Sequence, residues 1–147
     1  YQEFLDYYQK NCQVKTRAYD GIMELLKELH ESNIKMAIVS NKAHGAVDEL
    51  NEIYFKDYIK VAIGENEAAG IKKKPAPDSV FHALKLLGSK KEEAVYVGDS
   101  EVDRATAENA GMDCVLCSWG FRERELLEGL KPIAIIDEPK DLLKIIK

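Results

Sequence analysis

Long apolar segments are absent from this 147-residue chain, which has no window near the roughly 18 uninterrupted apolar residues that a membrane-spanning helix needs. Its first ten residues, YQEFLDYYQK, are too polar for a secretory signal peptide. Positive charge is also in deficit: the formal net charge is -5, whereas nucleic-acid binding generally requires a basic surface. We therefore expect a soluble, cytoplasmic protein with no membrane contact and no nucleic-acid partner.

Cysteine is scarce, and its distribution excludes two common uses of the residue. The three cysteines, Cys12, Cys114 and Cys117, are odd in number and do not suggest a disulfide framework. Cys114 and Cys117 form a C-x-x-C pair inside DCVLCSWG, which has the pattern of a strand. Side chains three apart on a strand point to opposite faces, so the pair cannot readily share a metal ion. We expect both to be small, buried core residues.

The hydrophobic pattern predicts strands and helices in alternation. Hydrophobic residues make up 46% of the chain and charged residues 32%, the balance of one globular domain. Short apolar runs predict strands over residues 34–40, 58–64, 93–99, 113–120 and 132–137. Amphipathic segments predict helices over residues 1–12, 21–33, 40–55, 72–88, 101–111, 121–130 and 139–147. Continuous apolar strands joined by helices indicate a doubly wound α/β fold with a mainly parallel sheet.

Ligands of such sheets bind beyond the carboxyl ends of the strands, so the residues that follow each strand are the candidates for chemistry. One such end carries Asp99 and, four residues later, Asp103, with Gly98 allowing a close approach of the backbone. Clustered carboxylates are costly unless a cation neutralises them, which favours a hard divalent ion. The alternative is structural, since acidic residues favour helix N-termini and Ser100 could be a helix cap.

Two other strand ends suit a phosphoryl group. Ser40 offers a hydroxyl, and we expect the following helix to begin at or just after it, so that the amides of Asn41 and Lys42 form an anion site. Lys74 ends a run of three lysines and is stiffened by two nearby prolines. The other two lysines of the run are expected to be solvated. A fixed cation near a hydroxyl and a metal site is an arrangement that binds phosphoryl groups.

Three segments in order carry a family resemblance: VSNK at 39–42, KKKPAPD at 72–78 and VGDSEVDRATAENAG at 97–111. They resemble motifs two, three and four of the haloacid-dehalogenase-like (HAD) phosphatases, and are most similar to those of phosphoglycolate phosphatases and their close relatives. The resemblance extends from about residue 17 onward and implies a HAD-like, Rossmann-like core.

The resemblance also implies roles for single residues. Ser40 would hydrogen-bond the transferring phosphoryl group, Asn41 would add a phosphate or substrate contact, and Lys74 would offset the charge of the phosphoryl group and of an aspartyl-phosphate intermediate. Asp99 would ligate Mg²⁺, and Asp103 would support the metal shell directly or through water. Ser40, Lys74, Asp99 and Asp103 are thus the expected catalytic set.

One motif of the family is missing, since no Asp-x-Asp occurs in the chain. In the family this motif supplies the nucleophile and the general acid and base, so we expect the nucleophile to lie outside this chain and the chain alone to be inactive. Residues 1–16 would be the last helix of a helical cap domain and a linker. Residues 17–147 would be the core without its first strand, whose position lies between the strands ending at Asp99 and Ser40. Unpaired strand edges there would favour a homodimer.

The expected function is Mg²⁺-dependent hydrolysis of a small phosphorylated metabolite, with phosphoglycolate as the first substrate to test and pyrophosphate, sugar phosphates and nucleoside monophosphates still open. One alternative is a catalytically inactive fragment that binds phosphate or docks a partner. Another is a receiver-like signalling domain, which uses similar residues at its strand ends. The order of the hydroxyl, the lysine and the acidic pair along this chain disfavours the receiver.

Overall fold

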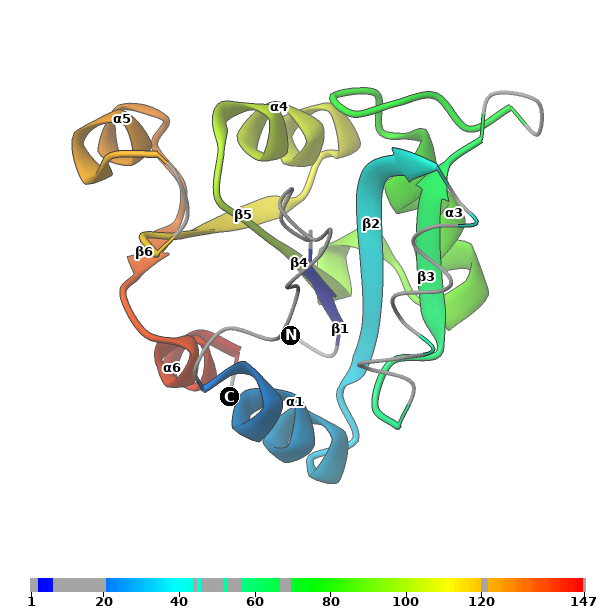
Figure 1. Cartoon of the computed structure of the whole chain (residues 1–147), viewed down its shortest axis with the longest axis horizontal. Helices are drawn as coiled ribbons and strands as arrows, with labels where there is room; N and C mark the ends of the chain where they lie inside the picture. Colours follow the sequence, from blue (N-terminus) through cyan, green and yellow to red (C-terminus); the bar gives the residue numbers. More distant parts are fainter. Residues whose placement is uncertain are drawn as a thin grey trace.

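A single parallel sheet organises the chain (Figure 1). The computed structural model describes residues 3–6, 21–43, 45, 52, 57–66, 70–119 and 122–146. The sheet has six strands in the order β3-β2-β1-β4-β5-β6, and all five neighbouring pairs are parallel. The strands are β1 (Glu3–Asp6), β2 (Lys35–Ala43), β3 (Val61–Glu65), β4 (Ala94–Gly98), β5 (Asp113–Cys117) and β6 (Ala134–Ile136). The α/β class and the parallel sheet predicted from the sequence are confirmed.

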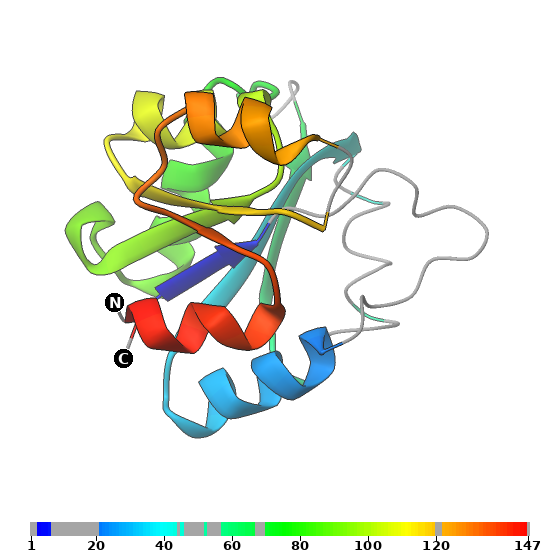
Figure 2. The same cartoon turned by 90° about the vertical axis from the view of Figure 1, so that its left-hand side faces the viewer.

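Helices cover both faces of the sheet (Figure 2). They are α1 (Ile22–Glu31), α3 (Asp78–Leu87), α4 (Glu101–Ala110), α5 (Arg124–Gly129) and α6 (Leu143–Ile146), with short 3-10 turns η2 (Lys91–Glu93) and η3 (Pro139–Leu142). The elements α1, η3 and α6 pack on one face, and α3, α4 and α5 pack on the other. Among the described helices, none has the length and apolar character needed to cross a bilayer.

The two-residue period of the strands divides the buried residues into two clusters, one on each face of the sheet. In β4, Val95 and Val97 join the cluster under α1, whereas Tyr96 joins the cluster under α3 and α4. In β5, Cys117 lies in the first cluster and Cys114 in the second, both buried. The expectation that the two cysteines occupy opposite faces is confirmed, and they share no site.

The predicted helix over residues 1–12 is wrong at Glu3–Asp6, because this segment is strand β1 in the centre of the sheet. Its backbone pairs in register with Lys35–Ile38 on one side and Ala94–Val97 on the other. The expectation that this position is empty is therefore also wrong. Helical spacing of apolar residues is a local signal, whereas pairing with two open strand edges is a long-range one that satisfies both rows of backbone groups. For the rest of residues 1–16, the assignment to the last helix of a cap domain and a linker stays a prediction, since residues 1–2 and 7–16 lie outside the described part.

A second boundary differs at the end of β2. The sequence predicts a helix from Ser40 onward, but β2 continues through Asn41 and Lys42 to Ala43, with a register shift against β3. Gly45 and Glu52 are helical, and most of the predicted helix between them lies outside the described residues. The main-chain amides of Asn41 and Lys42 therefore belong to a strand and do not form a helix N-terminus. The expected helix N-terminus is therefore not available at these two residues for binding a phosphate.

Glycines end two of the helices, as the sequence predicts. Gly88 follows α3 with φ 71° and Gly111 follows α4 with φ 74°, both in the left-handed region that other residues adopt only at a cost. Each donates its backbone N–H to carbonyls of the last turn. These caps end both helices cleanly before the next strand.

We expect Gly88→Ala to lower the free energy of unfolding by about 1 kcal/mol, because the described residues beyond its chain neighbours place no atom within 4 Å of an added Cβ and backbone strain remains. Thermal unfolding should show a loss of roughly 2–4 °C. Gly129→Ala is the matched control: Gly129 also has open space around it, but its φ is not in the left-handed region, so its melting temperature should not fall. Equal losses in the two variants would contradict this account of Gly88.

Candidate active site

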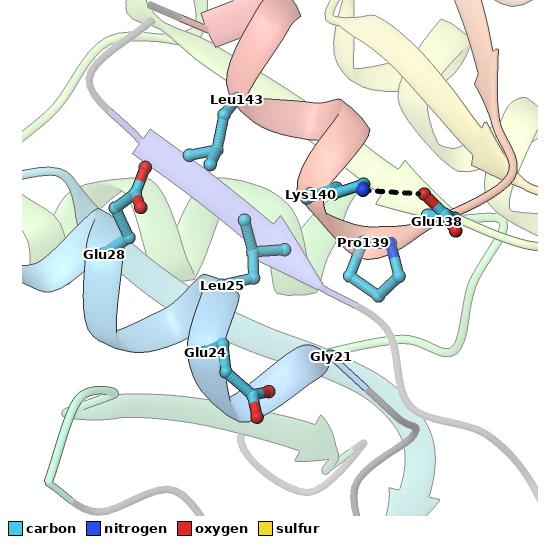
Figure 3. A pocket seen from close by; sticks show the side chains of 8 residues that line it. All are labelled: Gly21, Glu24, Leu25, Glu28, Glu138, Pro139, Lys140 and Leu143. Atoms are coloured by element: carbon cyan, nitrogen blue, oxygen red, sulfur yellow. Dashed lines mark ion pairs between the residues drawn. The ribbon is translucent and has the colours of Figure 1, made fainter.

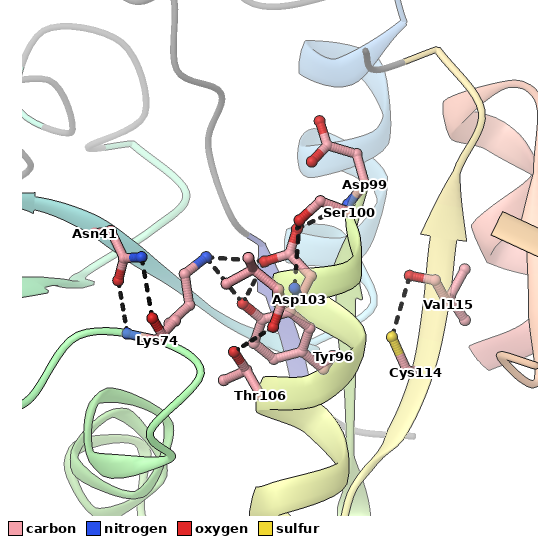
Figure 4. Close-up of polar contacts among 10 residues, drawn as sticks. Asn41, Lys74, Tyr96, Asp99, Ser100, Asp103, Thr106, Cys114 and Val115 are labelled. Carbon is pink, nitrogen blue, oxygen red and sulfur yellow. Dashed lines mark hydrogen bonds and ion pairs between the residues drawn. The ribbon is translucent and has the colours of Figure 1, made fainter. Parts of the chain in front are cut away.

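The predicted site residues lie at or near the carboxyl edge of the sheet. Ser40 is a buried residue of β2, Asp99 follows β4 directly, and Asp103 lies in the first turn of α4. Lys74 lies in the loop between β3 and α3. The structure links Lys74 to Asp103 and to Asn41, so residues 33 and 29 positions apart in the sequence come into contact (Figure 4).

A buried ion pair between Lys74 and Asp103 is the centre of this site. The Lys74 Nζ donates to Asp103 Oδ1 at 2.8 Å, and the two side chains are only 2% and 1% exposed. The hydroxyl of Tyr96 is 3.2 Å from Lys74 Nζ and donates to Asp103 Oδ1 at 2.9 Å. Lys72 and Lys73 are exposed, which confirms that only the last lysine of the run is fixed inside the protein. Burial makes such a pair costly to break on one side.

The carboxylate of Asp103 is fully engaged by protein donors. While Oδ1 accepts from Lys74 and Tyr96, Oδ2 accepts from the backbone N–H of Asp99 at 2.9 Å and from the Ser100 hydroxyl at 3.2 Å. A carboxylate offers about four acceptor positions, and these four donors occupy them. Ser100 also caps α4 by accepting from the Asp103 backbone N–H, so the predicted cap is present. Asp103 is thereby turned toward Lys74, and its support of a metal shell stays a prediction.

Position 98 requires a glycine, because the Asp103 side chain leaves no room for a Cβ atom there. An added Cβ at Gly98 would overlap the Cβ, Cγ and Oδ2 atoms of Asp103. The close approach anticipated for this glycine therefore serves the Asp103 side chain, which packs directly against the end of β4. A side chain at position 98 would displace the carboxylate from Lys74 and Tyr96.

Asn41 holds the main chain of Lys74. Its Oδ1 accepts from the Lys74 backbone N–H at 2.7 Å, and its Nδ2 donates to the Lys74 carbonyl at 3.3 Å. Both ends of the amide are used in this way, and the expected phosphate or substrate contact of Asn41 stays a prediction. The amide thus fixes the backbone from which the Lys74 side chain extends.

Asp99 is the carboxylate that fits a magnesium ion. Its side chain points away from the Lys74–Asp103 pair in Figure 4, while its backbone N–H binds Asp103. Carboxylate oxygen is a ligand type that Mg²⁺ prefers. Within the described residues, no three His, Cys, Asp or Glu side chains gather as a metal site, so Asp99 would hold the ion together with groups outside them. Glu101 is turned to Arg122, with which it forms two hydrogen bonds of 2.8 and 3.0 Å.

Comparison with known proteins of similar sequence or fold identifies the family of this chain. The sequence family of haloacid dehalogenase-like hydrolases matches residues 1–117. This chain belongs to that family. It is 37% identical over 145 residues to a candidate pyrophosphatase PpaX of Caldanaerobacter subterraneus, and 33% identical over 129 residues to the pyrophosphatase PpaX of Bacillus cereus. A crystal structure of a candidate phosphoglycolate phosphatase from Lactobacillus delbrueckii superposes with a TM-score of 0.87 at 40% identity.

The HAD-like chain spans only part of these relatives. It covers 65% and 59% of the two PpaX proteins, which align with 98% and 87% of this chain. The Lactobacillus structure is covered to 56%, with 92% of this chain aligned. The resemblance drawn from the three sequence motifs is confirmed at the level of the family, while the roles of single residues stay predictions.

Two residues of this HAD-like site were missed by sequence reasoning. Tyr96 lies in an apolar strand, where an aromatic ring is ordinarily read as core, and its hydroxyl was the available signal because a buried Tyr O–H needs a partner. Asn109 lies on the exposed part of α4 and donates from Nδ2 to the Pro75 carbonyl at 2.8 Å. Nothing in its local sequence indicates a contact 34 residues away.

A cavity of about 370 Å³ lies elsewhere, between α1 and the η3–α6 segment (Figure 3). Its wall includes Glu24 and Glu28 of α1 and the ion pair of Glu138 with Lys140. It contains no predicted site residue and belongs to the face opposite α4. The cavity is therefore separate from the predicted site residues at the carboxyl edge.

We expect Gly98→Ala to lower the free energy of unfolding by about 2–4 kcal/mol, since the new methyl group displaces a buried carboxylate from its partners. Urea denaturation at neutral pH measures the change. Gly129→Ala serves again as the control with open space. A loss below about 0.5 kcal/mol, the range of ordinary surface changes, would show that Asp103 does not depend on a glycine at position 98.

We expect the Cys114 thiol to resist alkylation in the folded protein. Burial, reinforced by the negative charge of Asp103 and opposed by Arg104, raises the pKa of Cys114 from 9.0 to about 12. Iodoacetamide at mildly alkaline pH should label position 114 only after unfolding in guanidinium chloride, as read by peptide mass mapping. Because the folded state keeps its proton while the unfolded state loses it, stability should fall as pH rises from 9.0 toward about 12. Cys114→Ala should reduce that slope, and rapid labelling of the folded chain would contradict the burial.

Proposed function

We propose that this chain is part of a cytoplasmic, Mg²⁺-dependent HAD-like phosphatase that hydrolyses a small phosphorylated substrate. The observation that carries the proposal is the buried Lys74 ammonium, held by Asp103 and Tyr96 at the carboxyl edge of the sheet. A fixed cation in a site shielded from water stabilises developing negative charge far better than a mobile surface lysine. The chain's family and its similarity to proteins named as phosphatases support the same reaction class.

Four side chains of this chain have defined tasks in the proposed reaction. Ser40 donates its hydroxyl to an oxygen of the phosphoryl group, and Lys74 offsets the charge on that group during in-line transfer. Asp99 holds Mg²⁺, which supplies further positive charge to the phosphoryl oxygens when bound. Asp103 keeps the Lys74 ammonium in place. Since no Asp-x-Asp occurs in the sequence, the Asp that accepts the phosphoryl group and the acid and base lie outside this chain.

Pyrophosphate and 2-phosphoglycolate are the leading substrate candidates for the proposed reaction. The similar proteins are named as pyrophosphatases and a phosphoglycolate phosphatase, and both substrates carry a second anionic group close to the phosphoryl group. We therefore propose a small substrate with two neighbouring anionic groups, with pyrophosphate and 2-phosphoglycolate as the leading candidates.

The second candidate function is phosphate binding without turnover, favoured by the missing Asp-x-Asp. The receiver-like alternative has no support from the family match. A homodimer formed through the open edges of a missing strand loses its rationale, because β1 pairs with both β2 and β4.

The reaction is tested in the full-length product of the gene that encodes this sequence. Asp99→Asn should abolish Mg²⁺-dependent hydrolysis of pyrophosphate and 2-phosphoglycolate, and Lys74→Ala should lower kcat by about 10²-fold or more, because each removes a positioned charge. Lys73→Ala is the matched control, since Lys73 is the exposed neighbour of Lys74. Turnover is measured as phosphate release with and without Mg²⁺.

Folding and chemistry have to be separated in this test. Lys74→Ala leaves the Asp103 carboxylate buried without its cation, so the double variant Lys74→Met/Asp103→Asn, which removes both charges, is measured beside it. Near-normal turnover in a folded double variant would overturn the role of Lys74. Turnover by the 147-residue chain alone would contradict a nucleophile outside it, whereas phosphate binding without turnover by the full-length product would favour the second candidate.

A further inference from the structure

The loop that carries Lys74 is attached to the rest of the protein by two asparagine side chains. Asn41, from the end of β2, binds both the N–H and the carbonyl of Lys74. Asn109, from α4, donates its Nδ2 to the carbonyl of Pro75 at 2.8 Å. One amide comes from strand β2 and the other from helix α4, and they bind adjacent residues of the loop.

Further hydrogen bonds lie within the loop itself. The Lys72 backbone N–H donates to Asp78 Oδ2 at 3.1 Å, and the Ala76 N–H donates to the Lys73 carbonyl at 3.0 Å. Those bonds lie within the loop and the start of α3, so they shape it without fixing its place. Among the described residues, the side-chain hydrogen bonds from Asn41 and Asn109 connect its backbone to β2 and α4.

Helix α4 therefore contacts this loop at two points. Asp103 near its beginning binds the ammonium, and Asn109 near its end binds the backbone one residue beyond Lys74. The lysine side chain is long and has several rotatable bonds, so fixing its tip alone leaves its base free to shift. A helix is a rigid spacer, and bonds at both positions hold the base and the tip at a constant separation.

We propose that Asn109 is a positioning residue for the phosphoryl-transfer reaction: by holding the Pro75 carbonyl, it sets where the Lys74 ammonium stands. The inference rests on the proposed function of Lys74. It assigns Asn109 no contact with substrate or metal. Displacement of a charged group by a fraction of an ångström lowers the rate of the chemical step while leaving the fold intact.

A purely structural role for Asn109 predicts something different. Asn109 is exposed, and a single solvent-accessible hydrogen bond contributes little to stability. A structural role would appear as a lower melting temperature with an unchanged rate for the folded enzyme. A positioning role would appear in kcat, and only while Lys74 is present.

The test uses the full-length gene product with pyrophosphate and 2-phosphoglycolate as substrates. Asn109→Ala should lower kcat about tenfold with KM changed less than about twofold, because the affected group acts mainly on the transition state. Asn109→Asp keeps the shape but replaces the donor with an oxygen facing the Pro75 carbonyl, so it should lower kcat at least as much. Glu108→Ala, at the exposed neighbouring position on α4, should leave kcat unchanged.

A double-mutant cycle then decides between the roles. In the Lys74→Met/Asp103→Asn background, Asn109→Ala should lower kcat by no more than about twofold, because the group it positions is gone. A full tenfold loss in that background, or wild-type kcat in Asn109→Ala itself, would overturn the inference. Loss of the proposed function is recognised separately, since the background variant would then keep normal turnover whatever residue stands at position 109.

Discussion

The buried ion pair of Lys74 and Asp103 is the interaction on which the arrangement of this site depends. Two opposite charges taken out of water are tolerable only when each is matched by its partner and by further hydrogen bonds. Asp103 meets that requirement with four donors, from a loop, a strand, a turn and a helix cap. The surrounding features, from the bare α-carbon of Gly98 to the hydroxyl of Tyr96, follow from making room for this carboxylate and satisfying it.

The same pair separates the tasks of two acidic residues that look equivalent in the sequence. The Asp103 carboxylate accepts hydrogen bonds from four protein donors, while the Asp99 side chain points away from the ion pair (Figure 4). A buried lysine without a counter-ion is costly to keep charged. If both carboxylates bound a metal ion, Lys74 would lack that counter-ion. In the proposed function, one acid would serve the lysine and the other a metal ion, so that both cations would be held at one edge of the sheet.

Much of the fold was accessible from the sequence because its signals are local. The apolar runs of β2, β4 and β5, the amphipathic faces of α1 and α3, and the C-terminal glycines Gly88 and Gly111 each depend on near neighbours. The failures occurred where distant partners decide. Residues 3–6 have helical spacing yet pair with two strands, and β2 continues past Ser40 beside β3. Asn41 binds a backbone 33 residues away, a contact that no local pattern predicts.

By itself, the sequence determined the α/β class, the order of the described helices and strands from residue 21 onward, and the set of polar residues at the strand ends, because periodicity and composition are properties of contiguous segments. Its three motifs were also enough to indicate the family. Only the tertiary structure decided what each polar residue faces: Lys74 inward to Asp103, Asn41 and Asn109 to the lysine loop, and Asp99 away from the pair. Hydrogen-bond partners are chosen among groups that the folded chain brings together, and no local pattern records that choice.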